Sequence, residues 1–473
     1  MDSLSQCRRA DPACSSRHRS FISRLSIFQY TSLVTISELR SDTPLKRAVT
    51  GRLLFFFILG DILGAGVYAL VGVISKEVGG ALWVPLMAAL GLALLTAGSY
   101  AELVTKYPRA GGAAVFAERA FRRPLISYLV GFCMLAAGVT SAAGLALAFT
   151  GDYLAAFVDV PAAPAALVFL ALLGLLNARG IRESVRSNLV MTVIEVSGLL
   201  LVIGLVAFFV LAGGGDVSRV SEFTPGVNPA AAVLGASLIA YYSFVGFEVS
   251  ANVAEEVRGI SRVYPRALFG ALLTAGVVYL LIGLAASAAL PAKDLAGSSS
   301  PLLDVVAATG AGIPPWLFGL VALVAVTNGA LLALVMASRL TYGMAGQGLL
   351  PSVLGRILPN RRTPWVAILV TTGAAMALTL TGDLASLAET VVLLLLFVFL
   401  STNIAVLVLK RDRVEHGHFS IPAVIPYLAI GSCLLLLSQQ DGAIWLRAAI
   451  LLAVGLVLYA AGRLVRNRRN LPA

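Results

Sequence analysis

Twelve apolar segments dominate this chain and constrain its fold more than any other feature of the sequence. A helix that crosses a bilayer needs about 20 predominantly apolar residues, and 59% of the 473 residues are hydrophobic while only 12% are charged. Soluble chains average about 25% charged residues, so a soluble core could not bury this much apolar surface. The alternating pattern of a membrane β-barrel is absent. The sequence therefore predicts an all-α polytopic membrane protein with 12 transmembrane helices, placed near residues 52–75, 81–104, 124–150, 161–178, 188–213, 230–254, 265–290, 314–338, 364–381, 386–409, 420–438 and 443–463.

The basic residues are distributed unevenly between the two sides of these spans. Of the 35 lysines and arginines, 31 fall on one side, and the other side holds only Lys76, Arg219, Lys293 and Arg447. Because positive residues mark cytoplasmic loops, we expect a multi-pass protein of the cell membrane with both termini in the cytoplasm. The net charge of +11 thus reflects orientation in the bilayer, and it does not predict a nucleic-acid partner.

The first predicted span contains "LGDILGAGVYALVG", residues 59–72, with four glycines and Asp61. Each glycine weakens a helix by about 1 kcal/mol relative to alanine, and an aspartate at the centre of a membrane helix costs about 2.5–3.5 kcal/mol. Backbone at membrane depth leaves the helix only where it is buried in protein or lines a wet cavity. A break here would offer amide and carbonyl groups to the carboxylate and ammonium of a zwitterion. The alternative is that the glycines form a close helix-packing surface.

The sixth predicted span contains a comparable stretch, "YYSFVGFEVSANVAEE", residues 241–256, which places Ser243, Gly246, Glu248 and Asn252 within an otherwise apolar segment. It comes five spans after the first, and an offset of five spans inverts the orientation in the membrane. Interrupted segments at corresponding positions of two inverted halves are typical of a transporter site at the bilayer midplane. We therefore predict unwound backbone near residues 64–66 and 243–246, with the substrate bound between them.

Four stretches of this sequence resemble motifs of the amino acid–polyamine–organocation (APC) superfamily, of the bacterial amino acid permease type. "GAGVYALVG" resembles the first-helix signature, and "AELVTKYPRAGGAAVFAERAF" (101–121) resembles the loop after helix two. "FVGFEVSANVAEEVR" (244–258) resembles the sixth helix, and "SRLTYGMAGQGLLP" (338–351) resembles the loop after helix eight. Where many members have Glu-Glu-x-x-Asn-Pro after the sixth helix, this chain reads Glu-Glu-Val-Arg-Gly-Ile. This departure lies in a predicted cytoplasmic loop and leaves the substrate open.

The resemblance implies a 5+5 inverted repeat of the leucine-transporter type plus two C-terminal helices. The chain then divides into a cytoplasmic N-terminal tail that we expect to be disordered (1–51), a first repeat (52–213), a second repeat (230–409), helices 11 and 12 (420–463) and a cytoplasmic C-terminal tail (464–473). Carried over by position, the residues that match substrate contacts of these permeases are Ile62, Gly64, Ala65 and Gly66 in the first helix and Tyr242, Ser243, Val245 and Gly246 in the sixth.

Two acids within the predicted spans are candidates for coupling or substrate pairing, because acids inside a membrane are functional by default. Asp61 would pair with a substrate ammonium or carry a proton; the alternative is that it only shapes the break. Glu195, in the fifth span, matches by position a lysine of several proton-coupled relatives. Burial favours the neutral form of a carboxyl group, so Glu195 is our preferred proton carrier, and the alternative is a structural ion pair with an arginine. Glu102 and Glu248 match acids common in the family and are interpreted as structural.

The resemblance implies secondary active transport of an amino acid or related amine across the cytoplasmic membrane. Proton-coupled symport by alternating access is our preferred interpretation; the alternatives are an uncoupled amino acid or polyamine exchanger (antiporter) and, more remotely, a transporter-like nutrient sensor. We do not expect an enzyme, because the sequence has neither a His-Glu-x-x-His motif nor a Walker loop and its three histidines lie outside the spans. We expect no cofactor and no metal site. The expected partners are the substrate, protons and the lipid bilayer, and the oligomeric state is left open.

Overall fold

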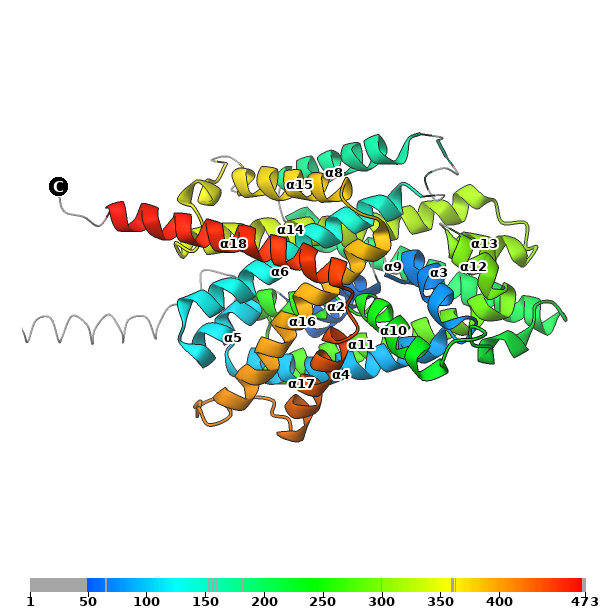
Figure 1. Cartoon of the computed structure of the whole chain (residues 1–473), viewed down its shortest axis with the longest axis horizontal. Coiled ribbons are helices and arrows are strands. Elements are labelled where there is room, and N and C mark those ends of the chain that lie inside the picture. Colours follow the sequence, from blue (N-terminus) through cyan, green and yellow to red (C-terminus); the bar gives the residue numbers. More distant parts are fainter. Residues whose placement is uncertain are drawn as a thin grey trace, which may run out of the picture. The chain divides into compact units, whose positions relative to one another are not determined.

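The computed structural model describes residues 49–469, apart from residues 64–65, 110, 152–153, 155–156, 159, 180–181, 299, 359–360 and 362. The predicted N-terminal tail up to residue 48 and the last residues of the C-terminal tail, from 470, lie outside the described residues. The described part is helical throughout (Figure 1), with one isolated β-bridge between Val49 and Val257. The all-α prediction is confirmed for this part of the chain.

Ten segments of the described residues are helical, long enough and apolar enough to cross a membrane. Two of them are composite and consist of α2 (Gly51–Leu63) with α3 (Gly66–Val78), and of α10 (Pro229–Tyr242) with the 3₁₀ helix η2 (Phe247–Glu256). The other eight correspond to single helices, which are α4 (Trp83–Lys106), α6 (Pro124–Phe149), α8 (Ala162–Arg179), α9 (Arg182–Leu211), α11 (Ile260–Ala289), α14 (Pro315–Gly346), α16 (Leu384–Leu409) and α18 (Gly442–Arg469).

The two remaining predicted spans contain shorter helices. α15 (Trp365–Thr379) and α17 (Val424–Leu437) have 15 and 14 residues, which correspond to about 22 and 21 Å of helix. The hydrocarbon core of a bilayer is about 30 Å thick, so neither helix alone reaches across it. Prolines limit both helices, since α15 follows Pro364 directly and Pro422 lies just before α17. The full set of twelve spans therefore stays a prediction.

Local sequence signals explain several helix starts. Pro124 occupies the first turn of α6, where its missing N–H has no helical partner to lose. The side chain of Asn228 caps α10 by accepting a hydrogen bond from the amide of Ala230 at 2.9 Å. The carboxylate of Asp383 caps α16 by accepting a hydrogen bond from the amide of Ser386 at 2.7 Å.

The predicted loops contain short helices that were not expected from the sequence. They are α5 (Gly112–Phe121), α12 (Ala292–Gly297), α13 (Pro301–Ala308), η1 (Val217–Ser221) and η3 (Ser352–Gly355).

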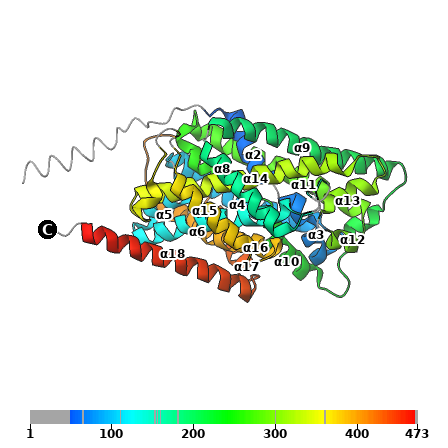
Figure 2. The same ribbon diagram turned by 90° about the horizontal axis from the view of Figure 1, so that it is seen from above.

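The core of the molecule lies around α6, which packs against α14 and α16 and is the most buried span. In contrast, α8, α9 and α18 keep large apolar side chains exposed, including Leu175, Phe208 and Val457. Figure 2 shows α9 and α18 at opposite edges of the helix assembly. Exposed apolar faces of this kind suit contact with lipid tails, because lipid requires no polar covering of the side chains.

Predicted equivalents of the two repeats pack against each other in pairs. α4 contacts α11, α6 contacts α14, and α8 contacts α15; the last pair runs side by side in Figure 1. These pairs are the second and seventh, third and eighth, and fourth and ninth predicted spans. Contacts between corresponding helices are compatible with a two-fold axis between inverted repeats. The inverted repeat itself remains a prediction.

Candidate functional site

The first predicted span consists of α2, which ends at Leu63, and α3, which begins at Gly66. Gly64 and Ala65, two of the predicted substrate contacts, lie outside the described residues. The predicted break in this span therefore stays a prediction. What the structure does describe is how both flanking helices approach the sixth span.

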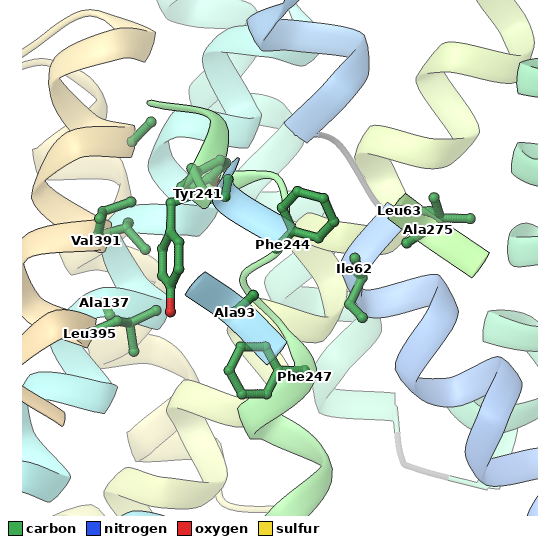
Figure 3. Close-up of a cluster of buried hydrophobic side chains, with 14 of the residues drawn as sticks. Ile62, Leu63, Ala93, Ala137, Tyr241, Phe244, Phe247, Ala275, Val391 and Leu395 are labelled. Carbon is green, nitrogen blue, oxygen red and sulfur yellow. The ribbon is translucent and has the colours of Figure 1, made fainter. Parts of the chain in front are cut away.

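The sixth span is interrupted at the predicted position. α10 ends at Tyr242, residues 243–246 form turns, and the chain continues as a 3₁₀ helix from Phe247. Gly246 has φ of 123° and ψ of −30°, a backbone conformation that residues with a Cβ rarely adopt. Glu248 turns back and accepts a hydrogen bond from the amide of Gly246 at 2.9 Å. Figure 3 shows the ribbon leaving the helical path between Phe244 and Phe247.

The interrupted segment lies directly against the first span. A Cβ on Gly66 would come within 2.5 Å of the Cα of Ser243, and a Cβ on Gly246 would lie 2.8 Å from the carbonyl oxygen of Asp61. The hydroxyl of Tyr279 on α11 lies 2.7 Å from the carbonyl oxygen of Ile62 and 3.1 Å from that of Ser243. The two glycines therefore permit a backbone approach that no other residue type allows, and Tyr279 joins the ends of α2 and α10.

A cavity of about 60 Å³ opens between these segments. One enclosed water needs roughly 10–15 Å³ of such volume, so the cavity has room for a few waters or for the head group of a small zwitterion. Five of the predicted contacts line it, namely Ile62, Gly66, Tyr242, Val245 and Gly246, and so do Asp61 and Glu248. Ser243, the other predicted contact that the structure describes, does not line the cavity but contacts Gly66.

Three further helices complete the cavity wall, and the sequence analysis did not name their residues. α6 contributes Ser141, α14 contributes Ala333 and Met336, and α16 contributes Val391 and Leu395. The oxygen of Ser141 lies 3.0 Å from the hydroxyl of Tyr242. Only Ser141 carried a detectable signal, as a polar residue within an apolar span. Small and aliphatic residues on a membrane helix look the same whether they line a cavity or pack against a neighbour.

The acids of the site have few hydrogen-bond partners. Glu195 on α9 is fully buried, and neither of its carboxyl oxygens has a hydrogen-bond partner among the described residues. The same holds for Oδ2 of Asp61 and for the hydroxyl of Ser243. Asp61 follows Gly60, which lies against Thr192 one turn before Glu195 on α9, so the two acids belong to adjoining segments. Because buried polar groups are nearly always paired, these oxygens mark a place where a proton or a ligand group is expected.

None of the described residues that line the cavity is basic, and both described ion pairs lie elsewhere. The alternative in which Glu195 forms an ion pair with an arginine thus has no counterpart among the side chains that the structure describes. Glu195 is held in place through its backbone, since the hydroxyl of Tyr68 on α3 donates to its carbonyl oxygen at 3.1 Å. Its carboxyl group therefore has no neutralising partner among the described side chains.

A polar row on α9 precedes Glu195 and faces α2. The side chain of Asn188 accepts a hydrogen bond from Asn328 on α14 at 2.9 Å, and Thr192 donates to the carbonyl oxygen of Asn188 at 2.7 Å. A Cβ on Gly60 would overlap the hydroxyl of Thr192. Residues 188, 192 and 195 follow helical spacing, so they form one face that brings the carboxyl group of Glu195 towards the segment containing Asp61.

Glu102 has the structural role that its interpretation from the sequence assigned to it. Its carboxylate contacts Nζ of Lys410 at 3.1 and 3.0 Å and accepts a hydrogen bond from the amide of Ile421 at 2.8 Å. These contacts join α4 to the end of α16 and to the segment before α17. The carboxylate of Glu102 therefore has both a counter-charge and hydrogen-bond donors among the described residues, unlike Oδ2 of Asp61 and the carboxyl group of Glu195.

Comparisons with known proteins agree with this architecture. Residues 52–457 match the family described as "Amino acid permease". The chain is 26% identical to the methylthioribose transporter of Bacillus subtilis (strain 168) and 25% identical to the branched-chain amino acid permease BcaP of the same organism, and each alignment covers 92% of this chain and 97% of the relative. It is 30% identical to the chloroplastic cationic amino acid transporter 9 of Arabidopsis thaliana, over 64% of this chain and 56% of the relative.

All three relatives are named as transporters or permeases, and the family match extends over the first and sixth predicted spans and all residues that line the cavity. This chain therefore belongs to the amino acid permease family of the APC superfamily, and it is a multi-pass membrane transporter rather than an enzyme.

Proposed function

We propose that this permease takes up an amino acid or related amine across the cytoplasmic membrane by proton-coupled symport with alternating access. One observation carries the proposal above all others. Among the described residues, Oδ2 of Asp61 in the cavity wall and both carboxyl oxygens of Glu195 on α9 are buried without hydrogen-bond partners, and no described basic residue lines the cavity. Such a site is complementary to a positively charged group on the substrate and to a proton, and it disfavours an anion.

The substrate would bind to the backbone at both interrupted segments. If the first span breaks at residues 64 and 65, as the sequence predicts, the amides at the start of the half-helix that contains Gly66 would be unpaired and would lie at the positive end of its dipole, so they would suit the carboxylate of an amino acid. Asp61 and the carbonyl groups at the end of α2 suit the ammonium. The side chain would then extend towards Tyr242 and Val245, both of which line the cavity.

The names of the relatives do not select one substrate. They include methylthioribose, branched-chain amino acids and cationic amino acids. The carboxyl groups of Asp61 and Glu248 in the cavity wall favour the two classes that carry an ammonium. We therefore propose an ammonium-bearing substrate, and the geometry does not rank cationic above neutral amino acids.

The second carboxyl group is proposed to couple transport to protons. Two buried carboxyl groups that interact electrostatically cannot both be ionised without a large cost, so such a pair holds at least one proton. Glu195 is the proposed carrier because Asp61, and not Glu195, lines the cavity and would be engaged by the substrate. Opening of the cavity towards water on one side would let Glu195 release its proton there.

A counterflow assay tests the substrate class. Proteoliposomes loaded with unlabelled leucine, lysine, putrescine or methylthioribose would be assayed for uptake of the same compound in labelled form. We expect at least one ammonium-bearing compound to be taken up and Asp61→Asn to raise its KM more than it lowers its maximal rate. Uptake of methylthioribose together with no uptake of any amine would contradict the proposal.

A further inference from the structure

A second hollow lies on the outer surface between α2 and α11 and shares no residue with the substrate cavity. It has a volume of about 280 Å³. Its wall is mainly apolar, and two arginines interrupt it; α2 contributes Arg52, Phe55 and Phe56, and α11 contributes Val263, Arg266 and Ala267. We call this hollow the α2–α11 groove.

The two arginines of the groove lie at a similar level along the parallel helices. A Cβ on Gly51 would lie 3.2 Å from Val263, and a Cβ on Gly270 would lie 3.6 Å from the ring of Phe55. Arg52 and Arg266 fall between these two contacts. Both also lie within two residues of the start of a predicted span, on the side that the positive-inside count assigns to the cytoplasm. The groove thus begins where lipid head groups are expected.

The charges of the α2–α11 groove have no counter-charge among the described residues. Both arginines are exposed, none of the described residues that line the groove is acidic, and neither arginine belongs to an ion pair within this part of the chain. A guanidinium group binds a phosphate through two parallel hydrogen bonds and is more weakly hydrated than an ammonium. Two such groups above an apolar wall match a phosphate that carries an apolar chain.

Among possible occupants, a lipid fits better than the N-terminal segment of the chain. Residues 1–48 contain eight lysines and arginines and only four acids, so that segment repels two arginines. The inner leaflet, in contrast, presents anionic lipids to basic residues near its surface. We propose that the α2–α11 groove binds an anionic phospholipid, with the phosphate between Arg52 and Arg266 and one acyl chain along Phe55 and Phe56. The lipid would join α2, which carries Asp61, to α11.

Native mass spectrometry of the full chain in mixed micelles tests this site, with phosphatidylglycerol and phosphatidylcholine offered in equal amounts. We expect phosphatidylglycerol to be retained about 30-fold more strongly, which corresponds to about 2 kcal/mol for two arginines. The double variant Arg52→Gln with Arg266→Gln should lose most of this preference, and the double lysine variant should keep most of it. The control is Arg413→Gln, an exposed arginine outside the groove, which should behave like the unchanged protein.

Three results would overturn the proposal. The double glutamine variant could keep the full preference, the control could lose as much as the double variant, or the unchanged protein could show no preference at all. A fourth arm replaces the lipid with glycerol phosphate. Retention of glycerol phosphate as strong as that of phosphatidylglycerol would show a phosphate site without a role for the apolar wall, and it would also contradict a lipid site.

Discussion

At the scale of single residues, two glycines determine how closely the first and sixth spans approach. Gly246 combines a φ of 123° with 2.8 Å between its hypothetical Cβ and the carbonyl oxygen of Asp61. A hypothetical Cβ on Gly66 would lie 2.5 Å from the Cα of Ser243. The obstacle in both cases is backbone rather than the end of a flexible side chain, so a substitution displaces the segment that forms the cavity wall.

Gly246→Ala should impair transport strongly. The positive φ alone costs a residue with a Cβ about 1–3 kcal/mol, and the contact with Asp61 shifts the carbonyl groups proposed to bind the substrate. We expect counterflow to fall at least about tenfold, since each 1.4 kcal/mol lost in binding is a factor of ten. Gly235→Ala is the matched control, because Gly235 lies within α10 and nothing lies within 4 Å of its hypothetical Cβ. Equal activity of the two variants would contradict the role of Gly246.

The pair formed by Glu102 and Lys410 leads to a stability prediction. Lys410→Met leaves the buried carboxylate of Glu102 without its cation, which typically costs about 3–5 kcal/mol. We expect the lower end of this range, because the Lys410 side chain is still 23% exposed. A thermal denaturation series in detergent would measure the loss, with the exposed Lys293→Met as control. Adding Glu102→Gln to Lys410→Met should recover part of the stability. Equal thermal stability of Lys410→Met and the control would show that the ion pair between Glu102 and Lys410 does not stabilise the fold.

Residue chemistry also limits what the sequence could predict. Ser243 and Gly246 stood out because they interrupt an apolar span, and the break was found there. Ala333, Met336 and Leu395 line the same cavity, yet nothing in their residue types separates them from packing residues. Asn188, Thr192 and Asn328 are also polar residues within apolar spans, and they were not among the predicted site residues.

At the scale of secondary-structure elements, the sixth span departs most from expectation. Its second half is a 3₁₀ helix of ten residues, η2, where runs longer than three or four residues are uncommon and the hydrogen bonds have poorer geometry. Aromatic contacts hold η2 in place, since the ring of Phe247 stacks on Phe399 at 5.4 Å and meets Tyr100 edge to face at 5.6 Å. The sequence predicted where the helix breaks, but periodicity of apolar residues does not distinguish a 3₁₀ from an α-helical continuation.

Hydrogen exchange should detect this difference between elements. We expect the amides of η2 to exchange faster than those of α6, because 3₁₀ hydrogen bonds are weaker and the turn at Gly246 allows local opening. A transported amine should slow the exchange in η2 and leave α18 unchanged, since α18 contributes nothing to the cavity. Protection of η2 equal to that of α6, with and without substrate, would show that η2 is not a mobile element.

Short helices in the loops were missed for a related reason. The stretch 101–121 was interpreted as a loop because it resembles the loop after helix two of the family, yet its last ten residues form α5 and pack on η2 and α16. These ten residues would be marginal as an isolated helix, so packing against its neighbours stabilises α5. Tertiary contacts of this kind are not encoded in a local pattern.

At the scale of the whole molecule, the apolar segments of the sequence predicted most of the helices. Ten candidate spans are found among the described residues, and α15 and α17 occupy the places of the other two. The cytoplasmic position of both termini stays a prediction from the charge distribution. The pairing of α4 with α11, α6 with α14 and α8 with α15 could not be read from sequence, because similarity between the halves is too weak. The site results from this arrangement, since its wall combines segments more than 300 residues apart, from Asp61 to Leu395.

Proton coupling is the central claim of the proposed function, and Glu195→Gln in proteoliposomes tests it most directly. Glutamine keeps the shape of the side chain and removes its titration. The matched control is Glu389→Gln, because Glu389 is an acid of α16 that does not itself line the cavity. Substrate uptake would be followed under an imposed pH gradient, acidic outside, and counterflow would be measured in parallel without a gradient. We predict that the unchanged protein and Glu389→Gln accumulate substrate, whereas Glu195→Gln retains counterflow and loses accumulation. Accumulation by Glu195→Gln with the pH dependence of the unchanged protein would contradict Glu195 as the proton carrier.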